Sequence, residues 1–204
     1  MKNILCFGDS NTFGFNPHNG SRYKENERWS GILKEELKEK FNVIERGCNN
    51  RTCFIDNPSG IEQTGYKILP KYLTKDIDII IIALGINDIQ FLFNPSLEDV
   101  KEGLINLIKI TKNIHPKIDI VLLSPSTLTN DILNGYFSCQ FDELSIEKSK
   151  ELSKIYSSIA DEFNCKFIDL NKIAKVSHAD GLHYEIEEHK KIANYLKNFL
   201  CSSF

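Results

Sequence analysis

Short apolar runs alternate with longer amphipathic stretches along almost the whole chain. The run Ile77–Leu84 is β-branched almost throughout, which is typical of a parallel strand covered on both faces. Similar runs occur at Ile4–Phe7, Val43–Ile44, Ile118–Leu123 and Lys166–Asp169. Five strands that alternate with helices indicate βαβ units with right-handed crossovers. The sequence therefore predicts an α/β fold, a three-layer α/β/α sandwich around a parallel sheet.

The stretches between these runs carry apolar residues at helical spacing. They predict helices over Arg28–Phe41, Leu97–Ile114, Ile146–Phe163 and Ile186–Leu200. Trp29 lies on the apolar face of the first predicted helix. Its side chain could line a pocket, contact another subunit or belong to the core. We expect the core, because large aromatic side chains are usually buried.

Composition narrows the classes of function. A chain of 204 residues with 41 % apolar side chains suits one domain, expected over 1–204. The net charge of −3 leaves no large basic field, so no nucleic-acid partner is expected. No apolar run approaches the ~20 residues of a membrane span, so no membrane partner is expected either. The apolar run near Met1 is too short for a signal peptide of the usual ~7–15-residue core.

The six cysteines include no Cys-x-x-Cys pair. Reduced, mostly buried thiols in a cytoplasmic protein are the plain interpretation. Clustered metal ligands are not evident in the sequence, so neither a metal nor another cofactor is expected. Composition leaves the oligomeric state open, including a homo-oligomer.

The predicted architecture says where a ligand would bind, because sheets of this kind bind ligands beyond the carboxyl ends of their strands. Two long connections, Gly47–Gly65 and Ser126–Leu144, begin close to such ends. Loops of this length are usually functional or disordered. The second contains Tyr136, Phe137 and Phe141, which favours a packed rim over a site.

The first two strand ends carry weak signals. Gly8-Asp9-Ser10 follows the first strand, and Ser10 is either a nucleophile or a helix cap beside a glycine turn. Its surroundings do not form the G-x-S-x-G nucleophile elbow. Gly47 leads into Asn49 and Asn50 after the second strand. This segment either points backbone N–H groups into a cavity or forms an ordinary loop.

Two further signals come later in the chain. After the third strand, Asn87 can donate from its amide while Asp88 braces the turn, or the pair forms a simple Asx turn. Before the last helix, Asp180 can accept the Nδ1 proton of His183 and leave Nε2 free as a base. Most Asp-x-x-His pairs are chance surface features, and His178 and His189 lie nearby.

Together the four segments resemble the SGNH (GDSL-type) hydrolase family. Its blocks correspond to Gly8-Asp9-Ser10, Gly47 to Thr52, Gly85-x-Asn87-Asp88 and Asp180-x-x-His183, and they cover nearly the whole chain. Further segments resemble the aryl esterase/acyltransferase branch of that family. They are Arg28-Trp29, Glu45-Arg46-Gly47 with Arg51-Thr52, and Asp180-Gly181-Leu182-His183.

The resemblance implies a flavodoxin-like SGNH hydrolase fold with a five-stranded parallel sheet of order 2-1-3-4-5. It implies Ser10, His183 and Asp180 as the catalytic three. The implied oxyanion donors are the backbone N–H of Ser10, the backbone N–H of Asn50 and the side chain of Asn87. Supporting positions are Asp9, which would brace the loop around Ser10, together with Gly47, Gly85 and Asp88.

Two residues depart from the family pattern. Asn11 stands where leucine is usual, and Asn50 stands where glycine or another small residue is common. The Asn50 backbone can still donate, because asparagine tolerates left-handed geometry. Its side chain could narrow the acyl pocket, which leaves open the size of the acyl group.

The expected function is a serine esterase that forms an acyl-enzyme on Ser10. Its substrate would be a small-molecule ester, a short-chain carboxylic ester of an aryl alcohol or a sugar, with hydrolysis and acyl transfer both open. A lysophospholipase or thioesterase of the same family is the alternative. Less favoured are a metal-dependent hydrolase using Asp9, Asp88, Asp180 and His183, and a non-catalytic binding module on this fold.

Overall fold

The computed structural model describes residues 1–204 and contains one five-stranded sheet. All neighbouring strands are parallel, in the order β2-β1-β3-β4-β5. The strands are β1 (Lys2–Gly8), β2 (Phe41–Gly47), β3 (Ile79–Ala83), β4 (Asp119–Ser124) and β5 (Lys166–Asp169). The predicted α/β class and the strand order are confirmed.

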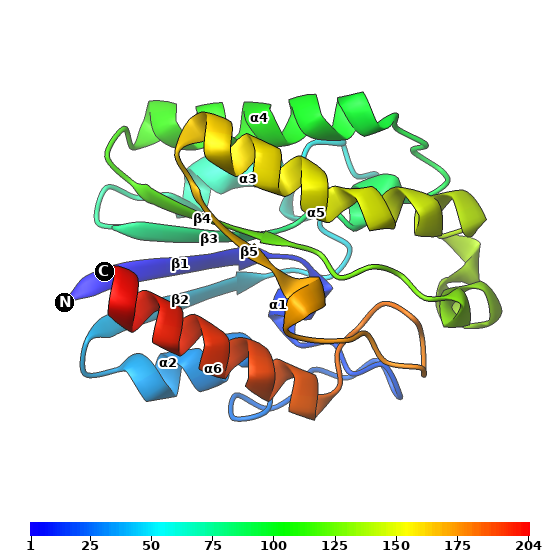
Figure 1. Ribbon diagram of the computed structural model, residues 1–204, viewed down its shortest axis with the longest axis horizontal. Helices are drawn as coiled ribbons and strands as arrows, with labels where there is room; N and C mark the ends of the chain where they lie inside the picture. The colour runs from blue at the N-terminus through cyan, green and yellow to red at the C-terminus, as the bar shows by residue number, and fades with distance from the viewer.

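Six α-helices cover the sheet or lie at its edge. They are α1 (Ser10–Phe13), α2 (Trp29–Leu37), α3 (Gly65–Tyr72), α4 (Leu97–Ile114), α5 (Glu143–Phe163) and α6 (Ile186–Ser203). Figure 1 shows α2 and α6 on one face of the sheet and α3, α4 and α5 on the other. The predicted three layers are present.

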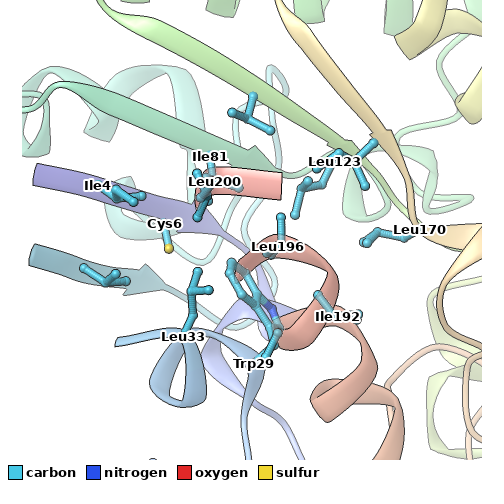
Figure 2. Close-up of a cluster of buried hydrophobic side chains, with 14 of the residues drawn as sticks. Ile4, Cys6, Trp29, Leu33, Ile81, Leu123, Leu170, Ile192, Leu196 and Leu200 are labelled. Carbon is cyan, nitrogen blue, oxygen red and sulfur yellow. The ribbon is translucent and has the colours of Figure 1, made fainter. Parts of the chain in front are cut away.

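Alternate residues of each strand enter two separate cores. In β1, Ile4 and Cys6 face α2 and α6, whereas Leu5 and Phe7 face α3, α4 and α5. This division follows from the two-residue period of a strand. Trp29 is only 2 % exposed and packs beside Leu196 and Ile192 of α6 (Figure 2). The expectation that Trp29 belongs to the core is confirmed.

Several element boundaries differ from the prediction, and one helix was not predicted. Helix α2 ends at Leu37, and Phe41 is the first residue of β2, where it pairs with Lys2. Helix α5 begins at Glu143, because Asp142 caps it through the backbone N–H of Ser145. Helix α3 was not predicted, since it is short and contains Pro70. At the end of α2 strand pairing overruled the local periodicity, and at the start of α5 a cap did so.

The register of the sheet brings three strand ends together. Gly8 lies opposite Gly47 on one side and Ala83 on the other. The connections after β1, β2 and β3 therefore start at a common edge. Figure 1 shows both chain termini at the opposite end of the sheet. None of the helices combines the length and the apolar character needed to cross a membrane.

Candidate active site

The turn after β1 presents Ser10 at the start of α1. Asp9 caps this short helix by accepting the backbone N–H of Asn11 at 2.9 Å. The backbone N–H of Asp9 donates to Ala83 of β3 at 3.3 Å, which fixes the turn against the sheet. Asp9 thus supports the loop that carries Ser10.

The side chains of Ser10, His183 and Asp180 form one hydrogen-bonded chain. Ser10 Oγ lies 2.8 Å from His183 Nε2, and His183 Nδ1 lies 2.6 Å from Asp180 Oδ2. The second oxygen of Asp180 accepts the backbone N–H groups of Leu182 and His183, both at 2.9 Å. All three residues of the chain are buried. The loop before α6 therefore brings the imidazole and carboxylate to the serine at the opposite end of the sequence.

The environment of Asp180 favours its charged form. Burial by itself would raise the pKa of this carboxyl group. The hydrogen bond and charge of His183, together with the two backbone N–H donors, outweigh burial and hold the pKa of Asp180 below its usual range. Asp180 can therefore accept a hydrogen bond from Nδ1 of His183, which orients the imidazole, and its negative charge stabilises the positive charge of the protonated ring.

Two phenylalanines flank the imidazole. The ring centroid of Phe15 lies 4.3 Å from that of His183, and the centroid of Phe137 lies 5.2 Å away. Phe137 belongs to the 126–144 connection, so part of this loop does form a rim over the site, whereas Tyr136 is exposed. Phe15 was missed, because nothing in its local sequence shows that it stacks on a residue from the far end of the chain.

A cavity of about 100 Å³ opens beside Ser10 and His183. Its walls come from the loops after β1, β2 and β3, from the 126–144 connection and from the His183 loop. The lining residues are Ser10, Phe15, Asn49, Asn50, Asn87, Phe137, Gln140, Leu182 and His183.

Two asparagines supply polar hydrogens at this cavity. Asn50 has left-handed backbone, with φ of 60°, and its N–H donates to no group of the protein. Asn87 Nδ2 donates one hydrogen to the backbone oxygen of Arg51 at 3.0 Å, which leaves its second hydrogen free. Ser10 is the first residue of α1, so its N–H has no partner within that helix. The three residues predicted to supply oxyanion donors thus line one cavity.

The supporting residues have specific structural tasks. A side chain at Gly47 would collide with α1, because its Cβ would lie 2.2 Å from the Phe13 nitrogen. Gly85 has φ of +114°, and a Cβ there would lie 2.1 Å from the hydroxyl of Tyr156. Both glycines therefore allow close packing beneath the site.

The side chain of Asp88 binds a segment outside its own turn. It accepts the backbone N–H groups of Cys53, Phe54 and Ile55 at 2.6, 3.0 and 3.2 Å. Burial raises the pKa of Asp88 to about 6, although these three donors oppose the change. Asp88 consequently holds the 47–65 connection against the loop that carries Asn87.

Asn11 links α1 to the histidine loop. Its Nδ2 donates to the backbone oxygen of Leu182 at 3.2 Å, and its own backbone oxygen accepts from Trp29 Nε1 at 3.1 Å. A leucine at this position could not make the first bond. The departure from the family pattern therefore adds a tie between Ser10 and the segment that carries His183.

The neighbouring histidines lie outside this chain of hydrogen bonds. His178 is exposed and contacts Asp131, while His189 is buried beneath Trp29. Burial lowers the pKa of His189 to about 3, so it is neutral near pH 7. No three His, Cys, Asp or Glu side chains lie close enough together to hold one metal ion. The four residues of the metal-dependent alternative therefore do not form such a cluster.

Comparison with known proteins identifies a matching family and several solved structures with a similar fold. The sequence model of the GDSL-like lipase/acylhydrolase family matches residues 6–187. No curated protein matches the chain. The aryl esterase of M. smegmatis is 29 % identical, with both chains covered completely and a TM-score of 0.90.

Two further solved structures are similar. Est24, a carbohydrate acetylesterase from Sinorhizobium meliloti, is 26 % identical over the full length of both chains, with a TM-score of 0.88. A member of the lipolytic G-D-S-L family from Veillonella parvula is 17 % identical over both full chains and shares the fold, with a TM-score of 0.73. The chain belongs to the GDSL-like lipase/acylhydrolase family, the SGNH group of esterase-type hydrolases.

Proposed function

We propose that this protein is a serine esterase that cleaves short-chain carboxylic esters of aryl alcohols or sugars through an acyl-enzyme on Ser10. One observation carries the proposal. The hydrogen-bonded chain Ser10–His183–Asp180 ends at a cavity where two asparagines and the Ser10 backbone offer free N–H groups. Nucleophile, base, orienting carboxylate and anion donors are the parts that acyl transfer requires.

In the first half of the reaction, Ser10 Oγ attacks the ester carbonyl carbon and His183 Nε2 takes the hydroxyl proton. Asp180 holds the imidazole with Nδ1 protonated and stabilises the imidazolium. The carbonyl oxygen becomes negative and accepts from the N–H groups of Ser10, Asn50 and Asn87. Loss of one such donor costs about 10²–10³ in rate, so Asn87 should matter nearly as much as the three catalytic side chains.

The first half ends when His183 gives this proton to the leaving alcohol as the C–O bond breaks, which leaves the acyl group on Ser10. In the second half, water enters, gives a proton to His183 and attacks the acyl carbon on Ser10. The carboxylic acid leaves and Ser10 regains its proton. If another alcohol replaces the water, the same steps transfer the acyl group instead.

The cavities support a substrate with a small acyl part and a ring-shaped alcohol part. The cavity beside Ser10 measures about 100 Å³, whereas a second depression of about 430 Å³ shares Phe15 and Phe137 with it. Aromatic side chains can stack on an aryl ring or on the apolar face of a sugar. The similar proteins, an aryl esterase and a carbohydrate acetylesterase, agree with both choices. We place the activity in the cytoplasm, where six unpaired cysteines would stay reduced.

The test is hydrolysis of p-nitrophenyl acetate by Ser10→Ala and His183→Ala. Each variant should lose roughly 10⁴–10⁶ of kcat, and a serine-directed phosphonate should label the wild type but not Ser10→Ala. Ser202→Ala and His178→Ala, both exposed positions, are matched controls that should keep wild-type turnover. Wild-type rates in Ser10→Ala would refute the proposal. Loss of activity with a chelator but no labelling would favour the metal-dependent alternative, and ligand binding without turnover would favour a binding module.

A further inference from the structure

Gln90 contacts both asparagines of the cavity from behind. It follows the turn that carries Asn87 and is 4 % exposed. Its Nε2 lies 2.8 Å from Asn50 Oδ1 and 3.3 Å from Asn87 Oδ1. No other side chain of the protein hydrogen-bonds to the side chains of both asparagines. Nothing in the sequence around Gln90 marks this residue, because its partners come from two different strand ends.

The bond to Asn87 fixes which end of that amide faces the cavity. An asparagine amide can rotate by a half turn and exchange its oxygen with its NH₂ group. Here Nδ2 donates to the backbone oxygen of Arg51, while Oδ1 accepts from Gln90. A half turn would set Oδ1 against one acceptor and NH₂ against one donor. Gln90 and Arg51 together therefore keep a hydrogen, rather than a lone pair, directed at the developing oxyanion.

The bond to Asn50 fixes a backbone conformation. Left-handed geometry is unfavourable for a residue with a Cβ, although asparagine tolerates it better than most. Two side chains anchor Asn50 in this geometry: Asn57 Nδ2 donates to its backbone oxygen at 2.7 Å, and Gln90 donates to its side chain. The bond from Gln90 also satisfies the side-chain oxygen of Asn50. Family members with a small residue at this position have no such side chain. An asparagine can therefore stand where a small residue is common and still leave its N–H free.

We propose that Gln90 is a positioning residue that aligns the two asparagine donors of the oxyanion hole. The inference rests on the proposed esterase function. Gln90 does not touch the reacting atoms. Its effect comes through donors that gain strength only as the carbonyl oxygen becomes negative. It should therefore raise kcat and leave KM nearly unchanged.

The experiment compares Gln90→Leu and Gln90→Glu with the wild type. Leucine removes both bonds at similar volume, and glutamate replaces the donor by an acceptor that repels both Oδ1 atoms. Both variants should lower kcat for p-nitrophenyl acetate by about 10–100-fold, less than removal of a donor outright, with KM within about twofold. Gln63→Leu, the same change at a partly exposed glutamine without a side-chain hydrogen bond, should have no effect on kcat. Affinity for a boronic acid that forms a tetrahedral adduct on Ser10 should fall by the same factor as kcat.

A double-mutant cycle separates alignment from general damage. In an Asn87→Ala background, Gln90→Leu should cost clearly less than it does alone, since one of its two targets is gone. If Gln90→Leu lowered kcat by the same factor in the Asn87→Ala background as in the wild type, the inference would be overturned. A kcat of Gln90→Leu within twofold of the wild type would also overturn it. If Gln90→Leu fails to fold, Gln90→Met takes its place in the same comparison.

Ser10→Ala in the same assay keeps the two proposals apart. Wild-type turnover in Ser10→Ala would refute the esterase mechanism itself. An inactive Ser10→Ala together with a fully active Gln90→Leu would refute only the role of Gln90.

Discussion

Two carboxyl groups near the site, those of Asp180 and Asp9, have pKa values shifted in opposite directions. Asp180 is stabilised in its charged form by His183, which suits a group that must orient an imidazolium. Asp9 is buried with one backbone N–H bond, and burial raises its pKa to about 7, against the opposing effects of that bond and of Arg51. The charge of Asp180 is therefore stabilised by its surroundings, whereas a charge on Asp9 lowers the stability of the folded state.

The cost at Asp9 predicts that Asp9→Asn stabilises the fold at high pH. Between the usual pKa of about 4 and the folded value of about 7, the folded state holds a proton that the unfolded state has released. The stability of the wild type therefore falls as pH rises through this interval. Asparagine can still cap α1 through its oxygen and is never charged. We expect Asp9→Asn to gain about 1–4 kcal/mol at pH 8.

The measurement is the free energy of unfolding in urea at pH 4.5 and pH 8 for both proteins. The gain of Asp9→Asn should shrink toward the lower pH. An equal gain at both pH values, or a loss at pH 8, would contradict the assignment of a raised pKa to Asp9.

At the scale of elements, β2 and α2 are joined by an ion pair near the start of the helix. Arg28 Nε and Nη2 donate to the two carboxylate oxygens of Glu45, both at 2.7 Å, and Ser30 Oγ donates to Glu45 at 2.6 Å. The Arg28 side chain is only 9 % exposed. This pair connects the segments Arg28-Trp29 and Glu45-Arg46-Gly47, and it holds the helix that supports Asn11 against the strand that leads to Asn50.

Glu45→Gln should therefore destabilise the protein by about 3 kcal/mol, because Arg28 keeps a buried charge without its partner. Replacement of both groups, as in Arg28→Met with Glu45→Leu, should recover much of that loss. The control is Glu35→Gln, which breaks the exposed pair with Lys38 and should change stability by less than about 1 kcal/mol. Urea unfolding at pH 7 measures all three. Equal effects of Glu45→Gln and Glu35→Gln would show that the buried pair is not special.

At the scale of the whole molecule, the site exists only where distant segments meet. Ser10 and His183 are 173 residues apart in sequence yet share a hydrogen bond. The cavity beside them is closed on one side by Phe137 from the 126–144 connection. Its volume is about 100 Å³. Its size is thus a property of the assembled fold.

This volume predicts the preference for acyl length. Rates with p-nitrophenyl esters should be highest between acetate and butyrate and should fall for longer chains, which a cavity of about 100 Å³ is too small to hold. Phe137→Ala should move the optimum toward longer chains by removing one wall. A wild-type maximum at palmitate would contradict the prediction, as would an unchanged profile in Phe137→Ala.

The sequence alone determined the strands, the sheet class and the edge where a ligand would bind, because these depend on local periodicity and on the rule for parallel sheets. It also pointed to Ser10, Asn87, Asp180 and His183 as candidates, since the short motifs at the strand ends together resemble the blocks of one family. Helix α3 was missed, because its contacts outweigh a weak local propensity.

The tertiary structure alone decided the roles of Phe15, Gln90 and Asn11, and it decided how Asn50 is held. Each acts through a partner from another loop: an imidazole, two amides or a backbone oxygen. Such contacts depend on register and on how loops close over the sheet, and a hydrogen bond is made or lost within a few tenths of an ångström. Residue spacing along the chain carries no information at that precision.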